Sequence, residues 1–404
     1  MLLVLYILIF SLLNAYVIWR TLRWMRHCNE VFSVIKYRFF LIIVLCLFSS
    51  IIIISYFLIE HPQFSFLHGL SSRWFGILFY IIFYIAIADI VRLLTKLVLK
   101  VFFKGKHEDI FKTKKIILPG GLLVVLLVGV TSIYGFIHVD KLHTVTYEAT
   151  INKSVANIES MRIVMVADHH LGYILGADYM EEMVEKINEL KPDIVCFAGD
   201  IFDNSFDSLD NPNAIRDAWL KIESKYGVYA CWGNHDVTEA LFSGFSVGSR
   251  KDALRDSRMD KLLKDSNIIA LGDETVLIDN SFYMIGRLDY QKAGDGTNNR
   301  MTITELTQNL DLSKPVLLMD HQPRDLGDVA NAGVDIDLSG HTHSGQMFPM
   351  NFTNKVEWEN NYGFYKKGDM FSIVTSGIGV YGPAMRVMTN SEVVAIDVTF
   401  DGNK

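Results

Sequence analysis

Four long apolar stretches occupy the N-terminal part of this 404-residue chain. Each is close to the roughly 20 apolar residues that a helix needs to cross a lipid bilayer. The stretches are Leu2–Trp19, Phe39–Ile59, Trp74–Val91 and Ile116–Val139. The second and the fourth are apolar all round rather than along one stripe, which is typical of helices that face lipid. We therefore expect residues 1–143 to form a transmembrane region with four helices.

Two other interpretations of these stretches are a signal peptide at the N-terminus and four buried helices of a soluble domain. No basic segment precedes the first stretch, and further apolar stretches follow it directly. A signal peptide would have a positively charged start and a cleavage site instead. These features favour a retained first helix in a multi-pass membrane protein whose helices contact membrane lipids.

Lysine and arginine residues are concentrated in two of the three connecting loops. The loop after the first stretch contains Arg20, Arg23, Arg26, Lys36 and Arg38. The loop after the third contains Arg92, Lys96, Lys100, Lys104, Lys106, Lys112, Lys114 and Lys115. Basic loops stay in the cytoplasm, so both termini and the C-terminal domain are expected to be extracytoplasmic, either periplasmic or on the outer face of the cell membrane. A specific site for anionic lipids is the alternative role of these loops.

The composition excludes two broad classes of protein. The formal net charge is −7, so nothing in the overall composition indicates a nucleic-acid-binding protein. The four cysteines, Cys28, Cys46, Cys196 and Cys231, form neither a CxxC motif nor a disulfide framework. We expect buried free thiols, because small buried cysteines are common in protein cores.

From Thr144 the apolar residues occur in short runs that alternate with helical patterns. Early strands are predicted at Ile163–Ala167, Ile194–Ala198 and Gly227–Trp232, and later ones at Asn267–Leu271, Thr275–Ile278, Phe282–Ile285, Pro315–Met319, Val334–Leu338, Phe371–Thr375 and Val393–Val398. Helices are predicted from a cap at Asp178 to Leu190, around Ile215–Ile222 and at Thr302–Leu310. We expect residues 144–404 to form an α/β domain of two packed mixed β-sheets flanked by helices, with Leu241–Lys251 as a loop over its site.

Polar side chains that suit metal ions stand directly after five of these strands. They are Asp168, His170, Asp200, Asn234, His235, His321, His341 and His343. Strand ends of this kind open on one edge of an α/β sheet, where ligands bind. The set contains carboxylate, imidazole and amide groups but no thiolate, which suits Mn, Fe or Zn. Two such metal ions about 3.5–4 Å apart are a known arrangement for phosphoester hydrolysis.

These five blocks, in this order, resemble the calcineurin-like metallophosphoesterase superfamily. The sequence GHTHSGQ at residues 340–346 is similar to the membrane-anchored bacterial branch with the pattern GHTHxGQ. The resemblance covers residues 160 to 400 and does not extend to the membrane region. It implies a dinuclear site with two divalent metal ions.

The resemblance also implies a role for each residue of the site. The first metal ion would be bound by Asp168, His170 and His343, and the second by Asn234, His321 and His341. Asp200 would bridge the two ions.

Further residues are implied to act on the substrate. His235 would be a general acid or transition-state donor rather than a ligand, and Asp236 would orient it. Asn234 and His235 would help to hold the phosphate. Arg386, at the end of a glycine-rich stretch, would contact the phosphate or form a structural ion pair. We expect His169 to point away from the metal ions, and Asp203 and Asp320 to have supporting or solvated roles.

The sequence thus predicts a membrane-anchored metal-dependent phosphoesterase, and more specifically a phosphodiesterase that uses attack by a metal-bridging hydroxide. The main alternative is a non-catalytic membrane-anchored binding protein with a metal-binding α/β domain. A transporter built from the four helices is disfavoured, because few charges lie inside the spans. The substrate is a phosphoester, and a lipid-linked compound, a cell-wall polymer and a soluble nucleotide all remain open.

Overall fold

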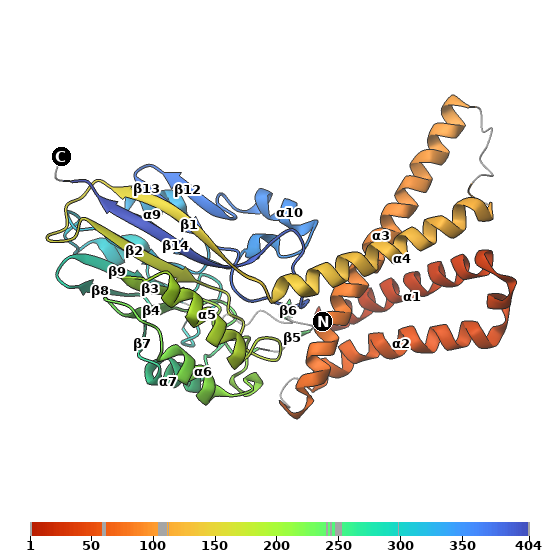
Figure 1. Cartoon of the computed structure of the whole chain (residues 1–404), viewed down its shortest axis with the longest axis horizontal. Coiled ribbons are helices and arrows are strands. Elements are labelled where there is room, and N and C mark those ends of the chain that lie inside the picture. Colours follow the sequence, from red (N-terminus) through yellow and green to blue (C-terminus); the bar gives the residue numbers. More distant parts are fainter. Residues whose placement is uncertain are drawn as a thin grey trace.

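The computed structural model describes residues 2–58, 62–103, 111, 113–239, 241–242, 245–246, 253–297 and 299–402. Of the predicted loop Leu241–Lys251, only the short hairpin strands β5 (Leu241–Phe242) and β6 (Phe245–Ser246) belong to these residues. Lys104, Lys106 and Lys112 lie outside them. An N-terminal group of long helices is followed by an α/β domain (Figure 1).

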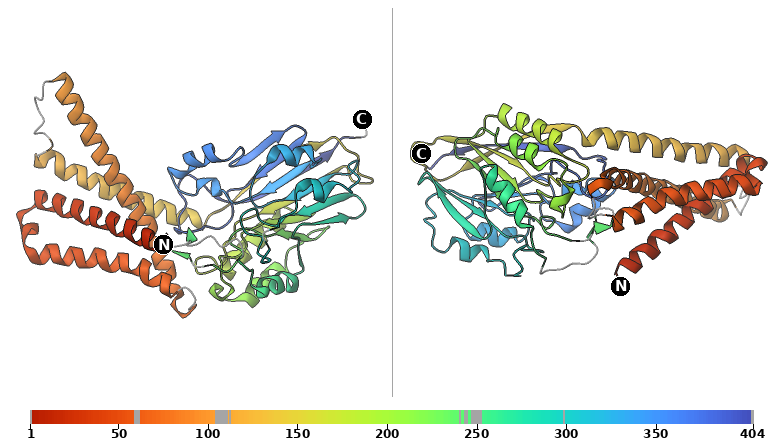
Figure 2. Two further views of the ribbon diagram at one scale, coloured as in Figure 1. Left: turned by 180° about the vertical axis from the view of Figure 1, so that it is seen from behind. Right: turned by 90° about the horizontal axis from the view of Figure 1, so that it is seen from below.

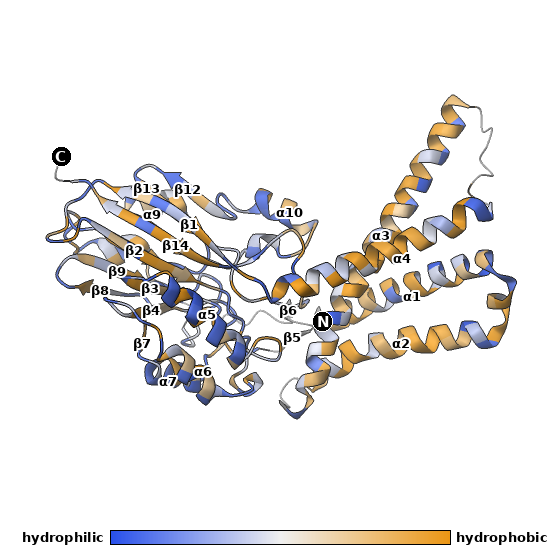
Figure 3. Ribbon diagram, in the orientation of Figure 1, coloured by the Kyte–Doolittle hydropathy of each residue, from blue (hydrophilic) through white to orange (hydrophobic). Residues whose placement is uncertain are grey.

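All four predicted membrane spans are confirmed as long helices. The helices are α1 (Leu2–Cys28), α2 (Ile35–Phe57), α3 (Ser65–Phe102) and α4 (Lys114–Val139). Each is long and apolar enough to cross a membrane, and apolar residues make up most of their length (Figure 3). Helix α3 begins nine residues before the predicted span, since Ser65 to Arg73 are helical as well.

The first sheet of the α/β domain starts almost directly after α4. Its strand order is β1-β14-β2-β3-β4-β7, and β14 pairs antiparallel with β2 whereas every other pair is parallel. The strands are β1 (Leu142–Ile151), β2 (Ser160–Val166), β3 (Ile194–Ala198), β4 (Val228–Cys231), β7 (Ile268–Ala270) and β14 (Ser391–Phe400).

The second sheet has the order β12-β13-β11-β10-β9-β8, with antiparallel pairs only at its two ends. The strands are β8 (Glu274–Ile278), β9 (Phe282–Gly286), β10 (Val316–Met319), β11 (Ile336–Ser339), β12 (Gly363–Lys367) and β13 (Met370–Val374). Both sheets are therefore mixed, as the sequence predicts.

The main core lies between the two sheets. Met165 and Cys196 from the first sheet pack with Met284, Leu317 and Ile336 from the second, and all five are completely buried. Helices cover the outer faces: α5 (Ala177–Glu189), α6 (Pro212–Trp219) and α7 (Ser257–Asp265) pack on the first sheet, and α8 (Ile303–Thr307) and α9 (Leu326–Asn331) on the second. The predicted architecture of two packed sheets flanked by helices is confirmed.

Two local predictions were wrong or incomplete. Gly176 rather than Asp178 is the N-cap of α5, and Asp178 lies inside the first turn, where its charge still suits the helix dipole. The sequence patterns also did not reveal α7, α9, β12 or α10 (Met350–Glu357), of which α10 has no buried residue.

The domain packs directly on the membrane helices. The backbone N–H of Arg386 donates to the carbonyl of Gly135 in α4 (3.0 Å), and the Tyr80 hydroxyl of α3 donates to the carbonyl of Phe348 (3.0 Å). Strand β1 leaves α4 and runs away from it, β14 runs parallel to β1, and β2 runs antiparallel to β14. The carboxyl end of β2 and of its parallel neighbours therefore faces the helices (Figures 1 and 2).

Candidate metal centre

The loops after β2, β3, β4, β10 and β11 meet at this helix-facing edge. They bring three groups of three side chains together, each with ligand atoms within 4.8 Å of one another; one is His170, Asp203 and His235, and the other two are described next. The first group is Asp168, His170 and His343, and the second is Asp200, His321 and His341. These are the two ligand sets expected from the sequence, apart from Asn234.

The first group is compact and completely enclosed. The Nε2 atom of His170 lies 3.1 Å from Nε2 of His343, and Oδ1 of Asp168 lies 3.4 Å from the same His343 nitrogen. At most 3% of any of these residues is exposed. Three ligand atoms converge on one point, which is what a metal site requires.

The second group contains the carboxylate expected to bridge. Oδ2 of Asp200 lies 3.0 Å from Nε2 of His321 and 3.8 Å from Nε2 of His170, which belongs to the first group. A single oxygen atom thus faces both ligand sets. The other oxygen, Oδ1, accepts a hydrogen bond from the backbone N–H of His235 (2.7 Å).

Asn234 supplies an independent indication that cations fit this centre. Its side chain is buried, and its Oδ1 atom has no hydrogen-bond partner among the described residues. Buried polar atoms are nearly always paired, so an unpaired one requires an explanation. A divalent cation bound by this amide oxygen provides one, and the surrounding imidazoles and carboxylates suit Mn, Fe or Zn.

The backbone of these loops is strained at the ligands themselves. Asp168, Asp200 and His341 have φ values of 54°, 48° and 68°, in the left-handed region that residues with a Cβ atom rarely adopt. Such conformations cost about 1–3 kcal/mol each and are found mainly at functional sites. The neighbouring Gly233 is also required, since a Cβ atom there would collide with the backbone nitrogen and carboxylate of Asp200.

The electrostatics of the second group favour a cation. Burial alone would raise the pKa of Asp200, but His321 and His235 outweigh it and hold that pKa well below its usual range. Burial would lower the pKa of His321, but the Asp200 carboxylate raises it well above its usual value. The negative field that attracts a proton to His321 would attract a metal ion in the same way.

Three of the other ligands are in forms that can bind metal ions. Burial lowers the pKa of His341 and of His343 well below the usual value, so both rings are neutral near pH 7. A neutral imidazole has the free nitrogen lone pair that a metal ion needs. Burial, together with the charge of Asp200, raises the pKa of Asp168 to about 6, so this carboxyl is largely ionised at pH 7.

His235 is fixed by a residue that the sequence did not identify. Its Nδ1 atom lies 2.7 Å from Oδ1 of Asn204, and the Nδ2 group of Asn204 donates to the carbonyl of Val237 (3.0 Å). That second bond fixes the amide orientation, so Nδ1 of His235 is the donor to Asn204. Burial lowers the pKa of His235 to about 4, which leaves its Nε2 atom unprotonated near pH 7.

Asp236 was expected to orient His235, but in the structure its carboxylate has other partners. Its Oδ1 atom accepts from the backbone N–H of Phe202 (2.8 Å), and its Oδ2 atom accepts from that of Gly233 (2.7 Å). Both oxygens therefore hold the loop backbone, because unpaired N–H groups would be costly in this buried region. Asp236 shapes the loop that carries Asn234 and His235, whereas Asn204 orients the imidazole.

Arg386 supports the backbone of the glycine-rich loop. Its side chain is completely buried, and Nη2 donates to the carbonyls of Ser376, Gly377 and Gly379 at 2.7, 3.1 and 2.6 Å. The guanidinium holds the glycine-rich loop from inside. Its Nε and Nη1 atoms have no hydrogen-bond partner among the described residues.

Three neighbouring residues lie outside the two ligand sets expected from the sequence. His169 is fully buried against Phe197, with ring centroids 4.6 Å apart, on the helix side of the sheet. Asp320 pairs with Arg287 (2.9 Å) and with Arg300. Asp203 lies 3.6 Å from Nδ1 of His170 and 3.8 Å from Nδ1 of His235, and the ligand atoms of these three residues are close enough together to hold a metal ion.

Tyr381 is a site residue that sequence reasoning passed over. Its ring centroid lies 5.4 Å from that of His343, 5.7 Å from that of His235 and 6.0 Å from that of His170. It stands in the glycine-rich stretch before Arg386, and its position beside a Gly-Pro pair was the available signal. This ring covers one side of the centre.

Several known proteins are similar to this chain in sequence. Residues 161–345 match the family described as calcineurin-like phosphoesterase. An uncharacterized metallophosphoesterase of Campylobacter jejuni is 28% identical over 418 residues, which cover 97% of this chain and 96% of that protein. The similarity to that relative therefore includes the helical region.

Two further matches are more distant. A Danio rerio protein described as a transmembrane protein with metallophosphoesterase domain is 26% identical over 287 residues, which cover 68% of this chain and 62% of that protein. Among solved structures, the NAD nucleotidase of Haemophilus influenzae has a TM-score of 0.35 and 13% identity, with 55% of this chain and 46% of that chain covered. The latter likeness is too distant to support an argument about function.

Proposed function

This chain belongs to the calcineurin-like phosphoesterases, metal-dependent hydrolases of phosphoesters, and from that membership we propose that it is a membrane-anchored phosphodiesterase with a dinuclear metal centre. The observation that carries the proposal is the position of Asp200. Its Oδ2 atom faces both His321 and His170, which belong to different ligand groups. One carboxylate shared between two sets of ligands is the arrangement that two adjacent cations need.

Each chain would hold two divalent ions, Mn, Fe or Zn. The first would be held by Asp168, His170 and His343, the second by Asn234, His321 and His341, and both by Asp200. When bound, the pair would lower the pKa of a water molecule and neutralise the non-bridging phosphate oxygens.

The chain's own side chains complete the reaction. The amide nitrogen of Asn234 and the ring of His235 lie on one loop, where they can hold the phosphate. Because Asn204 keeps the proton on Nδ1, His235 can donate from Nε2 only as an imidazolium. The negative charge of a bound phosphate would raise the pKa of His235 from about 4. His235 would then give its Nε2 proton to the departing alkoxide as a general acid.

A diester suits the charge of this centre better than a monoester. A phosphodiester carries one negative charge, whereas a monoester carries up to two and needs more compensation. Lys292 is paired with Glu239 (2.5 Å), and Nη2 of Arg386 donates to backbone carbonyls. Lys292 is thus already engaged, whereas Nε and Nη1 of Arg386 have no hydrogen-bond partner among the described residues.

The domain is proposed to lie outside the cytoplasm. Apart from Arg73, the basic residues of the described helices lie near the end of α1, the start of α2, the end of α3 and the start of α4, and these ends are remote from the domain (Figure 1). Because basic ends stay in the cytoplasm, the domain would be on the opposite side.

Hydrolysis by the purified full-length chain tests the proposal. Bis(p-nitrophenyl) phosphate and p-nitrophenyl phosphate should be offered with Mn, Fe and Zn in turn, alongside Asp200→Asn as a negative control. We expect a higher kcat/KM for the diester. Two bound metal ions without turnover of either compound would favour the alternative, a non-catalytic binding protein.

A further inference from the structure

Two loops next to the metal centre contact the first turns of α3. Tyr381, whose ring lies 5.4 Å from that of His343, is followed by Gly382. The carbonyl of Gly382 accepts a hydrogen bond from the Ser72 hydroxyl of α3 (2.6 Å). One wall of the metal centre therefore rests on a membrane helix.

A second loop of the site is attached to the same helix. Tyr173, three residues after His170, stacks on the ring of His68 in α3, with centroids 4.1 Å apart and planes at 18°. His68 is itself held by the Ser55 hydroxyl (2.7 Å) and the carbonyl of Leu58 (3.1 Å) at the end of α2. Both loops thus border the same segment of α3.

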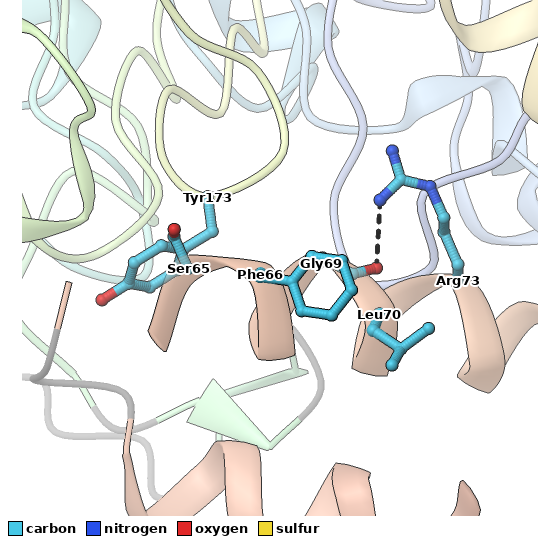
Figure 4. Close-up of a pocket in the computed structure, with 6 residues that line it drawn as sticks. All are labelled: Ser65, Phe66, Gly69, Leu70, Arg73 and Tyr173. Atoms are coloured by element: carbon cyan, nitrogen blue, oxygen red, sulfur yellow. Dashed lines mark hydrogen bonds between the residues drawn. The ribbon is translucent and has the colours of Figure 1, made fainter. Parts of the chain in front are cut away.

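A cavity of about 430 Å³ lies between Tyr173 and this segment (Figure 4). It is lined by Ser65, Phe66, Gly69, Leu70, Arg73 and Tyr173. Phe66 and Leu70 give it an apolar part, while Arg73 and the hydroxyl of Ser65 give it a polar part. Such a cavity suits an amphiphilic anion rather than a purely polar one.

The length of α3 places the cavity at the surface of the bilayer. The helix has 38 residues and is about 57 Å long at about 1.5 Å per residue, whereas the hydrocarbon core is only about 30 Å thick. Its continuous apolar segment begins at Trp74, directly after Arg73. Arg73 and the turns before it therefore lie at headgroup level, on the side where the domain sits.

Helix α10 indicates that the same edge of the domain meets lipid. Its apolar residues Met350, Phe352 and Val356 are 39%, 56% and 90% exposed. The ring of Phe352 lies 5.8 Å from that of Phe348, which in turn contacts Phe83 of α3 (5.7 Å). Exposed apolar groups beside a membrane helix are explained by contact with the bilayer.

We propose that the substrate is a phosphoester carried on a membrane lipid, and that it reaches the metal centre from the bilayer surface through this cavity. Phe66 and Leu70 would contact the start of the lipid chains, and Arg73 would attract the anionic headgroup. This inference rests on the proposed function, since the same centre would cleave the bond. Water forms the new bond to phosphorus, the P–O bond to one alcohol breaks, and that alcohol leaves with a proton.

The test uses the full-length protein in phosphatidylcholine vesicles that contain phosphatidylglycerol as the lipid probe. Soluble glycerophosphoglycerol and bis(p-nitrophenyl) phosphate are the probes without lipid chains. The variants are Phe66→Ala and Arg73→Gln. Phe102→Ala and Lys100→Gln are matched controls on the same helix, because Phe66 and Phe102 are similarly exposed (78% and 75%) and the controls lie at the opposite end.

We expect wild type to prefer the lipid probe, and both cavity variants to raise its KM by about tenfold, equivalent to about 1.4 kcal/mol. Their kcat/KM for the soluble diesters and the behaviour of the two controls should stay near wild type. Hydrolysis of soluble diesters with no activity on lipid, or equal losses on both kinds of probe, would overturn the inference but leave the phosphodiesterase intact. Absence of all hydrolysis at full metal occupancy would instead reject the proposed function.

Discussion

The Nε2 atoms of His170 and His343 lie 3.1 Å apart, although the two residues are 173 positions apart in the chain. Two imidazole lone pairs repel each other at this distance unless a proton or a cation lies between them. Burial opposes a charge on His170, but Asp203 and Asp200 outweigh it and raise the pKa of this ring. A cation that replaces the proton would meet the same carboxylates.

The first prediction concerns the shared carboxylate. Asp200→Asn should lower the metal content below two ions per chain and reduce hydrolysis to background, because the charge common to both ligand groups is lost. Elemental analysis and turnover of bis(p-nitrophenyl) phosphate check this. Asp217→Asn, an exposed residue of α6, is the control and should behave as wild type. An Asp200→Asn variant with two ions and normal turnover would show that Asp200 is not the bridge.

His235→Ala should lower kcat while the metal content stays near two. Loss of general acid assistance typically costs about 10²–10⁴-fold, and the loss should shrink for good leaving groups such as nitrophenolate, which leave without a proton. His341→Ala should lower metal occupancy whatever the leaving group. A metal ion lost from His235→Ala, or a defect that is flat across leaving groups of graded pKa, would contradict this role.

Asn204→Ala should have a smaller effect of the same kind. The variant loses the oxygen that holds Nδ1–H of His235 (2.7 Å), so the ring can rotate and present the wrong nitrogen. Losing a residue that orients a functional histidine costs about 10–100-fold. We expect this loss in kcat with two metal ions retained, and partial rescue by Asn204→Asp, which keeps an acceptor oxygen. A loss of metal ions would assign Asn204 to ligation instead.

His169→Leu should keep the metal ions and the activity. Neither ring nitrogen of His169 has a hydrogen-bond partner in the described part of the chain, and burial lowers its pKa to about 3. In the unfolded chain the pKa is about 6.5, so only the unfolded state gains this proton between pH 6.5 and 3. His169 therefore makes the free energy of unfolding decrease as the pH drops through that range.

The thermal unfolding midpoints of wild type and His169→Leu, compared from pH 7 down to the lowest pH at which both fold, check this. The unfolding midpoint of the variant should rise relative to that of wild type as the pH falls. If His169→Leu loses a metal ion, the assignment of His169 to the core is wrong.

The sequence predicted those parts that depend on local patterns. The sequence runs before Asp168, Asp200 and Asn234 are continuously apolar. The reason is that both faces of β2, β3 and β4 are buried, one against helices and the other against the second sheet. Such runs end where a polar residue begins, so the ligands could be placed at strand ends. Helix α10 was missed for the opposite reason: it has no buried residue and so no apolar periodicity facing a core.

Residue roles that depend on contacts between distant parts of the chain could not be predicted from the sequence. Asn204 is 31 positions from His235 and stands in a polar loop without a motif. The role of Asp236 was assigned by proximity in sequence, whereas its oxygens are taken by backbone amides of Phe202 and Gly233. For Arg386 the resemblance left a phosphate contact and an ion pair open, and only the folded loop reveals the three carbonyls to which it donates.

The orientation in the membrane can be tested separately. A reporter fused after Lys404 should be active only if it functions outside the cytoplasm, because the basic residues lie at the end of the helices remote from the domain. A pair of reporters, one active only in the cytoplasm and one only outside it, provides the control. Strong signal from the cytoplasmic reporter would reject the proposed orientation and localisation.

The number of metal ions in the active full-length protein tests the central claim most directly. The purified protein should be loaded with Mn, Fe or Zn, freed of excess metal and measured by elemental analysis against protein concentration. The arrangement of Asp168, His170 and His343 on one side of Asp200, and of His321 and His341 on the other, predicts two ions per chain. A fully active protein that contains one ion or none would contradict the dinuclear centre.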